Sequence, residues 1–83
     1  MTCELVYTQR AVRDVAALDA VMKKRIEKKI VALRTDPVAK SKKLSDPRLG
    51  TYRYRIGDYR VVFDLSRSQV VVLRIGHRRE IYR

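Results

Sequence analysis

The spacing of hydrophobic residues in the front half of the chain changes from that of a strand to that of a helix. Residues 3–7 form a short, mostly apolar segment that predicts a strand. Thr8 follows, and its hydroxyl is placed to cap a helix, because threonine accepts hydrogen bonds from the free N–H groups of a first turn. Apolar residues then recur at helical spacing from Ala11 to Leu18, so the pattern predicts a first helix there.

A second helix is predicted from Asp19, its candidate N-cap, to about Arg34. Pro37 follows shortly afterwards and is expected to end it, because proline cannot continue the hydrogen-bond ladder of a helix. Residues 36–46 are predicted to form a polar connector. The predicted helix has an apolar stripe formed by Met22, Ile26, Ile30 and Leu33, and an opposite, solvated face with Lys24, Arg25 and Lys28.

The back half is rich in Val, Ile, Tyr and Phe, which favour strands. Strands are predicted over residues 50–56, 59–65 and 70–75. Gly57 and Asp58 separate the first two, and glycine at the first central position suits a type II′ hairpin turn. Residues 66–69 indicate a second hairpin. The predicted fold is one α+β domain over residues 1–83, with an N-terminal strand and two helices packed on one face of an antiparallel sheet.

The turn at Gly57 also predicts which side chains share a face of the first hairpin. It places Arg55 directly opposite Arg60, and side chains alternate between faces along each strand. One face is then apolar and suited to meet the helices, with Tyr52, Tyr54, Ile56, Tyr59, Val61 and Phe63. The other face carries Arg53, Arg55 and Arg60. If the next hairpin places Leu65, Val71, Leu73 and Ile75 on the core side, Arg74 joins this basic face.

Charge narrows the choice of partner. Lys and Arg total 20 and Asp and Glu total 9, so the formal net charge is +11. This charge favours a partner of opposite sign: nucleic acid first, an acidic protein second and an anionic membrane surface a weaker third.

One cysteine and one histidine cannot form a structural zinc site, and three dispersed glycines form no phosphate-binding loop. No apolar run reaches the roughly 20 residues of a membrane span. We therefore expect a cytoplasmic protein without metal or cofactor.

The opposition of Arg55 and Arg60 is costly, because like charges across a strand pair destabilise a sheet. At about 4 Å and an effective dielectric constant of about 20, the repulsion is at most on the order of 4 kcal/mol before solvent screening. An anion between the two side chains would relieve it, and guanidinium groups match phosphate oxygens. Alternatively, the arginines pair with Asp58 or Asp64 on a solvated face. The tail adds cations and an aromatic ring, as single-stranded RNA binding requires: His77, Arg78, Arg79 and Tyr82.

Two stretches of the chain resemble the RelE branch of the RelE/ParE toxin superfamily. They are residues 52–63, with their Tyr-Arg repeat, and residues 71–82, which close on the pattern His-Arg-x-x-Ile-Tyr. The resemblance spans about residues 6–82 and implies a RelE-like, microbial RNase-type fold. It also implies the toxin of a type II toxin–antitoxin module, neutralised by an acidic, RelB-like antitoxin. RelE-like toxins cut messenger RNA in the ribosomal A site without a metal; the 2′-OH attacks the adjacent phosphate, leaving a 2′,3′-cyclic phosphate and a 5′-OH.

The resemblance implies roles for individual residues. Arg60 matches the transition-state arginine that holds the scissile phosphate, and Arg78 matches the arginine proposed to stabilise charge on the phosphate or the leaving oxygen. Tyr82 matches the tyrosine that stacks on a base or assists proton transfer. Arg53 and Arg55 occupy positions where well-studied members carry lysines, one of them the proposed general base. The candidate phosphate-binding residues are Arg53, Arg55, Arg60, Arg74, Arg78 and Arg79.

The departure at Arg53 and Arg55 leaves the proton acceptor open. Arginine has a pKa above about 12, so Arg55 is a poor base and would contribute charge instead. His77 is one candidate, because imidazole ordinarily titrates near neutral pH. Tyr82 and Glu80 are the others. Two further functions remain open, namely a ParE-like inhibitor of DNA gyrase and a non-catalytic RNA- or ribosome-binding module. ParE members generally lack the arginine and tyrosine constellation, so its presence favours RNA cleavage.

Overall fold

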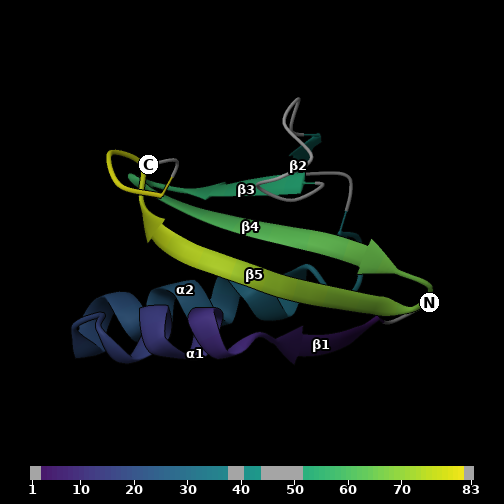
Figure 1. Ribbon diagram of the computed structural model, residues 1–83, viewed down its shortest axis with the longest axis horizontal. Coiled ribbons are helices and arrows are strands. Elements are labelled where there is room, and N and C mark those ends of the chain that lie inside the picture. Colours follow the sequence, from purple (N-terminus) through teal and green to yellow (C-terminus); the bar gives the residue numbers. More distant parts are fainter. Residues whose placement is uncertain (1–2, 38–40, 44–51, 82–83) are drawn as a thin grey trace.

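Two helices lie against one face of a curved sheet in the computed structural model, which describes residues 3–37, 41–43 and 52–81 (Figure 1). The elements are β1 (Glu4–Tyr7), α1 (Gln9–Ala16), α2 (Ala20–Ala32), β2 (Ser41–Lys43), β3 (Tyr52–Ile56), β4 (Tyr59–Ser66) and β5 (Gln69–His77). The predicted α+β class, with an N-terminal strand and two helices on one face, is confirmed.

The sheet of the described residues has five strands in the order β1-β5-β4-β3-β2. The strands β2 to β5 are antiparallel, as predicted for β3 to β5, whereas β1 departs from this arrangement and pairs with β5 in parallel, with Leu5 opposite Val70. Hydrophobic alternation identifies strands but carries no information on the direction of pairing. The strand β2 lies within the segment predicted to be a connector. Its sequence Ser-Lys-Lys has no apolar alternation, and it pairs with β3 as an edge strand, where lysines are common.

Both predicted helix caps are confirmed. The Thr8 hydroxyl accepts a hydrogen bond from the Ala11 N–H at 3.1 Å. The Asp19 carboxylate accepts one from the Met22 N–H at 2.8 Å. The helices end earlier than predicted, α1 at Ala16 and α2 at Ala32. Pro37 therefore does not terminate α2 itself.

The hydrophobic core lies between the helices and the sheet. Phe63 of β4 is fully buried at its centre, and the ring of Tyr52 stacks on it at a centroid distance of 5.6 Å. The predicted stripe of α2 faces this core, with Ile26 and Ile30 fully buried. The cluster of buried residues is Ala11, Val15, Ile26, Ile30, Leu33, Tyr54, Ile56, Val61, Phe63, Val70, Val72 and Ile75.

The register of the first hairpin is the predicted one. Arg55 lies opposite Arg60, and the six residues of the predicted apolar face all belong to the core or pack against it. Gly57 has a φ of 59°, whereas Asp58 keeps a negative φ, as a type II′ turn requires. Glycine is suited to this position because it has no Cβ to clash at positive φ. The turn therefore sets which side chains face away from the helices.

The second hairpin differs from the prediction in the phase of its last strand. Val70 and Val72 are buried, whereas Val71 and Leu73 are not part of the core, so their predicted placement is wrong. A two-residue turn places Ser66 opposite Gln69 in the pairing of β4 with β5. This pairing decides which residues at the start of β5 face the core. A β-bulge then shifts the register between Val72 and Arg74, opposite the Val62–Phe63 step. Ile75 returns to the core side as predicted, and Leu65 packs against the core.

Beyond the end of β1, residues at the start of α1 provide the hydrogen-bonding partners along the edge of β5. The Thr8 N–H donates to the Val72 carbonyl at 3.0 Å, and the Thr8 hydroxyl donates to the Leu73 carbonyl at 3.0 Å. The Ile75 N–H donates to the Asp14 carboxylate at 2.9 Å. These bonds satisfy backbone groups of β5 beyond the end of β1. Side chains of α1 therefore hold the bulged part of β5, which leads into the C-terminal turn.

Candidate functional site

Two arginines converge on the turn between β3 and β4. Nη1 of Arg60 donates to the Gly57 carbonyl and to the Tyr59 carbonyl, each at 3.0 Å. Nε of Arg55 donates to the same Gly57 carbonyl at 3.4 Å. The two cross-strand partners therefore share one neutral acceptor at the end of the hairpin. A carbonyl oxygen carries only a partial negative charge, so the two guanidinium charges are incompletely balanced by this contact.

A third arginine reaches this turn from α2. A Cβ placed on Gly57 would lie 3.4 Å from Nη2 of Arg25. The sequence assigned Arg25 to the solvated face of its helix, and its side chain is indeed exposed. Its proximity to Gly57 depends on how α2 lies across the sheet, and no local sequence signal reports that. Arg25 is therefore a member of the site that sequence reasoning missed.

The turn after β5 is tied to the same hairpin. The Arg78 N–H donates to the Asp58 carbonyl at 2.8 Å. The His77 carbonyl accepts the Glu80 and Ile81 N–H groups at 2.9 and 3.0 Å, and the Ile81 side chain is 2% exposed. These contacts hold the exposed residues 78–80 beside the β3–β4 turn. The structure thus brings Arg78 to the end of the sheet that carries Arg55 and Arg60, whereas Tyr82 lies outside the described residues.

Arg53 lies farther along β3, on the face away from the helices. It is half-buried and pairs in register with Val62. Val62 is 2% exposed although it does not belong to the core cluster between the sheet and the helices. Neighbouring side chains on the outer face of the sheet must therefore shield Val62 from solvent. The long aliphatic stem of an arginine can cover such a neighbour while its guanidinium stays in water. Arg53 therefore combines a packing contact with a charge on the same face as Arg55.

Arg74 contacts α1 and does not belong to the group of arginines at the β3–β4 turn. Its Nε lies 3.5 Å from Oδ2 of Asp14, whose Oδ1 lies 3.4 Å from Nε of Arg10. Asp14 is 12% exposed and also accepts the Ile75 N–H. Asp14 thus joins α1 to the bulged part of β5 through one backbone contact, from Ile75, and one side-chain contact, with Arg74. The guanidinium of Arg74 is engaged at the edge of the sheet, next to a cavity.

His77 lies on the helix side of the sheet. It pairs in register with Tyr59, which packs against the core, and the two rings meet edge to face at 5.6 Å. Both rings line a cavity of about 250 Å³ together with Asp14 of α1 and Arg74 of β5. Nδ1 of His77 accepts the Arg79 N–H at 3.2 Å. The ring is therefore separated by the sheet from the face that carries Arg53 and Arg55.

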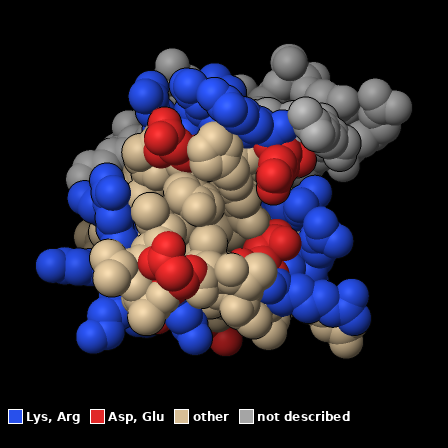
Figure 2. Space-filling view, turned by 90° about the vertical axis from the view of Figure 1, so that its left-hand side faces the viewer, with Lys and Arg blue, Asp and Glu red and all other residues tan. Residues whose placement is uncertain are grey.

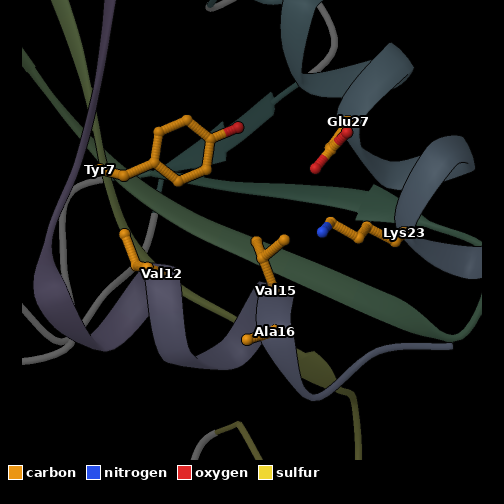
Figure 3. Close-up of a pocket in the computed structure, with 6 residues that line it drawn as sticks. All are labelled: Tyr7, Val12, Val15, Ala16, Lys23 and Glu27. Carbon is orange, nitrogen blue, oxygen red and sulfur yellow. The ribbon is translucent and has the colours of Figure 1, made fainter. Parts of the chain in front are cut away.

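A second, more apolar cavity of about 280 Å³ opens between β1, α1 and α2 (Figure 3). Tyr7 of β1 points into it, Val12 and Val15 of α1 form one wall, and Lys23 and Glu27 of α2 form the other. Val12 is 55% exposed. Burial raises the pKa of the Tyr7 hydroxyl above its ordinary value, and the negative charge of Glu27 raises it further. The tyrosine therefore remains a neutral hydrogen-bonding group beside an apolar opening.

The end of the molecule that carries the two turns shows charges of both signs. Figure 2 looks onto this end, where Lys and Arg side chains surround the rim and Asp and Glu side chains lie within the uncharged surface.

Among the described residues, no group of three or more His, Cys, Asp or Glu side chains is arranged to hold a metal ion. No helix in the described ranges is long and apolar enough to cross a membrane.

Comparison with known proteins adds independent information. A family model described as "ParE toxin of type II toxin-antitoxin system, parDE" matches residues 5–82. The RelBE2 toxin–antitoxin complex from Mycobacterium tuberculosis contains a chain that is 25% identical, with a TM-score of 0.84 over 93% of this chain and 99% of that chain.

Two further complexes share the fold. The RelE–RelB complex from Pyrococcus horikoshii OT3 has 24% identity and a TM-score of 0.78, over 96% of this chain and 99% of that chain. The intact RelBE complex from E. coli has 21% identity and a TM-score of 0.77, over 90% of this chain and 95% of that chain. No curated protein matches the chain in sequence.

Proposed function

Because the chain belongs to the ParE toxin family of type II toxin–antitoxin systems, within the RelE/ParE superfamily, we propose that it acts as a RelE-type endoribonuclease. In this proposal the toxin enters the ribosomal A site in the cytoplasm and cuts messenger RNA there without a metal, which stops translation. The observation that carries the proposal is the convergence of Arg55 and Arg60 on the single carbonyl of Gly57. A phosphate bound there would place a negative charge beside two guanidinium groups that share an uncharged carbonyl acceptor.

The proposed reaction is an internal phosphoryl transfer within the RNA. The 2′-oxygen forms a bond to the adjacent phosphorus, the bond from phosphorus to the 5′-oxygen breaks, and a 2′,3′-cyclic phosphate and a 5′-OH result. Arg60 and Arg55 would hold the scissile phosphate, and Arg78 would stabilise the leaving oxygen. Positive groups fixed before the reaction stabilise the extra negative charge of the transition state, and removing one such donor typically costs 10²–10³-fold in rate.

Proton transfer completes the proposed reaction. A base must accept the proton of the 2′-OH, and an acid must protonate the 5′-oxygen. The guanidinium of Arg55 cannot accept the first proton. Glu80, Tyr82 and His77 belong to the C-terminal segment beside Arg78, and the acceptor is proposed among them. The ring of His77 lies on the helix side of the sheet and Glu80 lines the same cavity, so their placement does not single out one of the three for this role.

We also propose a cognate, acidic antitoxin as partner. A negative partner would relieve the self-repulsion that a formal charge of +11 creates, and the similar toxins from M. tuberculosis, P. horikoshii and E. coli are found in complexes with RelB antitoxins. In this proposal an apolar side chain of the antitoxin enters the cavity beside Val12, while its flanking carboxylates meet Lys23 at the rim. Val12→Lys should then weaken the complex in a titration, whereas Val21→Lys, at a 79% exposed residue outside the cavity, should not.

The decisive experiment measures cleavage on programmed ribosomes with purified protein. Arg60→Ala and Arg78→Ala should each lower the rate of messenger cleavage by about 100-fold or more. Arg13→Ala, at an exposed residue of α1, is the matched control and should leave the rate unchanged. Circular dichroism should show all three variants folded. Wild-type rates in folded Arg60→Ala and Arg78→Ala would remove the catalytic assignment, and uncut message at high toxin excess would indicate a binding module instead.

A second candidate function is inhibition of DNA gyrase, as in ParE toxins, and the match to the ParE family model favours it. The two functions differ in what happens in induced cells. Gyrase inhibition should produce DNA damage and filamentous growth, whereas RNA cleavage should produce message ends at defined codon positions. Binding to single-stranded RNA should also lose about 0.7 units of log affinity per log unit of salt for each phosphate neutralised, so a salt-insensitive complex would argue against the RNA function.

A further inference from the structure

His77 begins the C-terminal turn with two different acceptors. Its backbone carbonyl accepts the Glu80 and Ile81 N–H groups at 2.9 and 3.0 Å. Its Nδ1 accepts the Arg79 N–H at 3.2 Å. A ring nitrogen accepts a hydrogen bond only when it carries no proton, so the neutral ring with its proton on Nε2 is the form that makes this contact. One residue therefore fixes the N–H groups of the three residues that follow Arg78.

The ring of His77 is itself fixed by its surroundings. The Tyr59 ring meets it edge to face at 5.6 Å. It lines the polar cavity, which Arg10 and Asp14 enter from α1, Arg74 from β5 and Glu80 from the turn. Arg60 follows Tyr59 on β4, and successive side chains of a strand point to opposite faces. The imidazole and the Arg60 guanidinium are therefore on opposite sides of the sheet.

We propose that His77 is a positioning residue, which holds the C-terminal turn so that Arg78 lies beside the Arg60 hairpin. The contact from the Arg78 N–H to the Asp58 carbonyl, at 2.8 Å, fixes the near side of the turn, and the His77 ring fixes the far side through Arg79. Its effect on cleavage rests on the proposed ribonuclease function, but its effect on the turn does not.

Two substitutions separate positioning from proton transfer. His77→Asn retains an oxygen that can accept the Arg79 N–H and does not titrate near neutral pH. His77→Phe retains an aromatic ring against Tyr59 but has no acceptor. If His77 positions the turn, Asn should keep the cleavage rate within about threefold of wild type, and Phe should lose about tenfold or more in kcat. If His77 were the general base, both should lose about 10²–10⁴-fold.

Amide hydrogen exchange provides a readout that does not depend on catalysis. At pH 8 the Arg79 N–H should exchange about threefold to tenfold faster in His77→Phe than in wild type or His77→Asn, as expected for one lost hydrogen bond. Equal protection of Arg79 in all three proteins would overturn the proposal. A toxin that cleaves no RNA but shows this exchange pattern would overturn the proposed function alone.

Discussion

Asp14 offers a stringent test of how α1 stabilises the bulged strand. Asp14→Ala removes the acceptor of the Ile75 N–H at 2.9 Å, and a hydrogen bond to a charged group contributes about 1.5–3 kcal/mol. It also removes the i,i+4 ion pair with Arg10, which contributes about 0.3 kcal/mol on an exposed helix face. Nε of Arg74, which is buried without a hydrogen bond among the described residues, loses its nearest carboxylate at 3.5 Å. The expected loss in the free energy of unfolding is about 3 kcal/mol.

Urea unfolding followed by circular dichroism would measure this loss. For a domain of this size, about 3 kcal/mol corresponds to a decrease in Tm of roughly 12–24 °C. Asp14→Asn is the matched control, because its amide oxygen can still accept the Ile75 N–H while the ion pairs are lost. It should cost only about 1 kcal/mol. A loss below 1 kcal/mol for Asp14→Ala, or equal losses for the two variants, would refute the assignment of the stability to the backbone contact.

Three further substitutions test other features of the fold. Arg55→Thr should raise the free energy of unfolding by about 0.5–1 kcal/mol in low salt, because it removes the charge opposite Arg60, and the gain should shrink in high salt; a salt-independent change would contradict this. Arg67→Gly should raise stability by up to about 1 kcal/mol in urea unfolding, because Arg67 has a φ of 55°, which glycine adopts without strain. The pKa of Tyr7 is raised, so its neutral form is favoured in the folded protein. Its contribution to the free energy of unfolding is therefore complete below the ordinary pKa of about 10 and is lost as the pH rises through the pKa in the folded state. Tyr7→Phe should remove this alkaline decline, and an unchanged decline would disprove the contribution of Tyr7.

The first hairpin could be predicted almost completely from the sequence, because its information is local. A two-residue turn at Gly57 sets the register, and the register with strict alternation sets both faces. The helix caps at Thr8 and Asp19 could be predicted equally well, since each is a hydrogen bond between a side chain and an N–H three residues later. Local chemistry thus accounts for the opposition of Arg55 and Arg60.

Features that depend on distant contacts could not be predicted in this way. The bulge in β5 follows from bonds between α1 and a strand more than 60 residues later in the sequence. It changes the phase of alternation within an apolar run, where every residue fits either face. The approach of Arg25 to Gly57 and the engagement of Arg74 by Asp14 are likewise set by packing.

The place of β5 between β1 and β4 has a consequence for synthesis of the chain. Any product interrupted before residue 69 leaves β1 without its parallel partner and leaves one edge of β4 open. Such a fragment lacks Val70, Val72 and Ile75, so the helices have only part of a sheet to pack on. Contacts between segments so far apart in sequence also form late and slowly in folding. Premature termination should therefore yield aggregation-prone, inactive fragments rather than a weakened toxin.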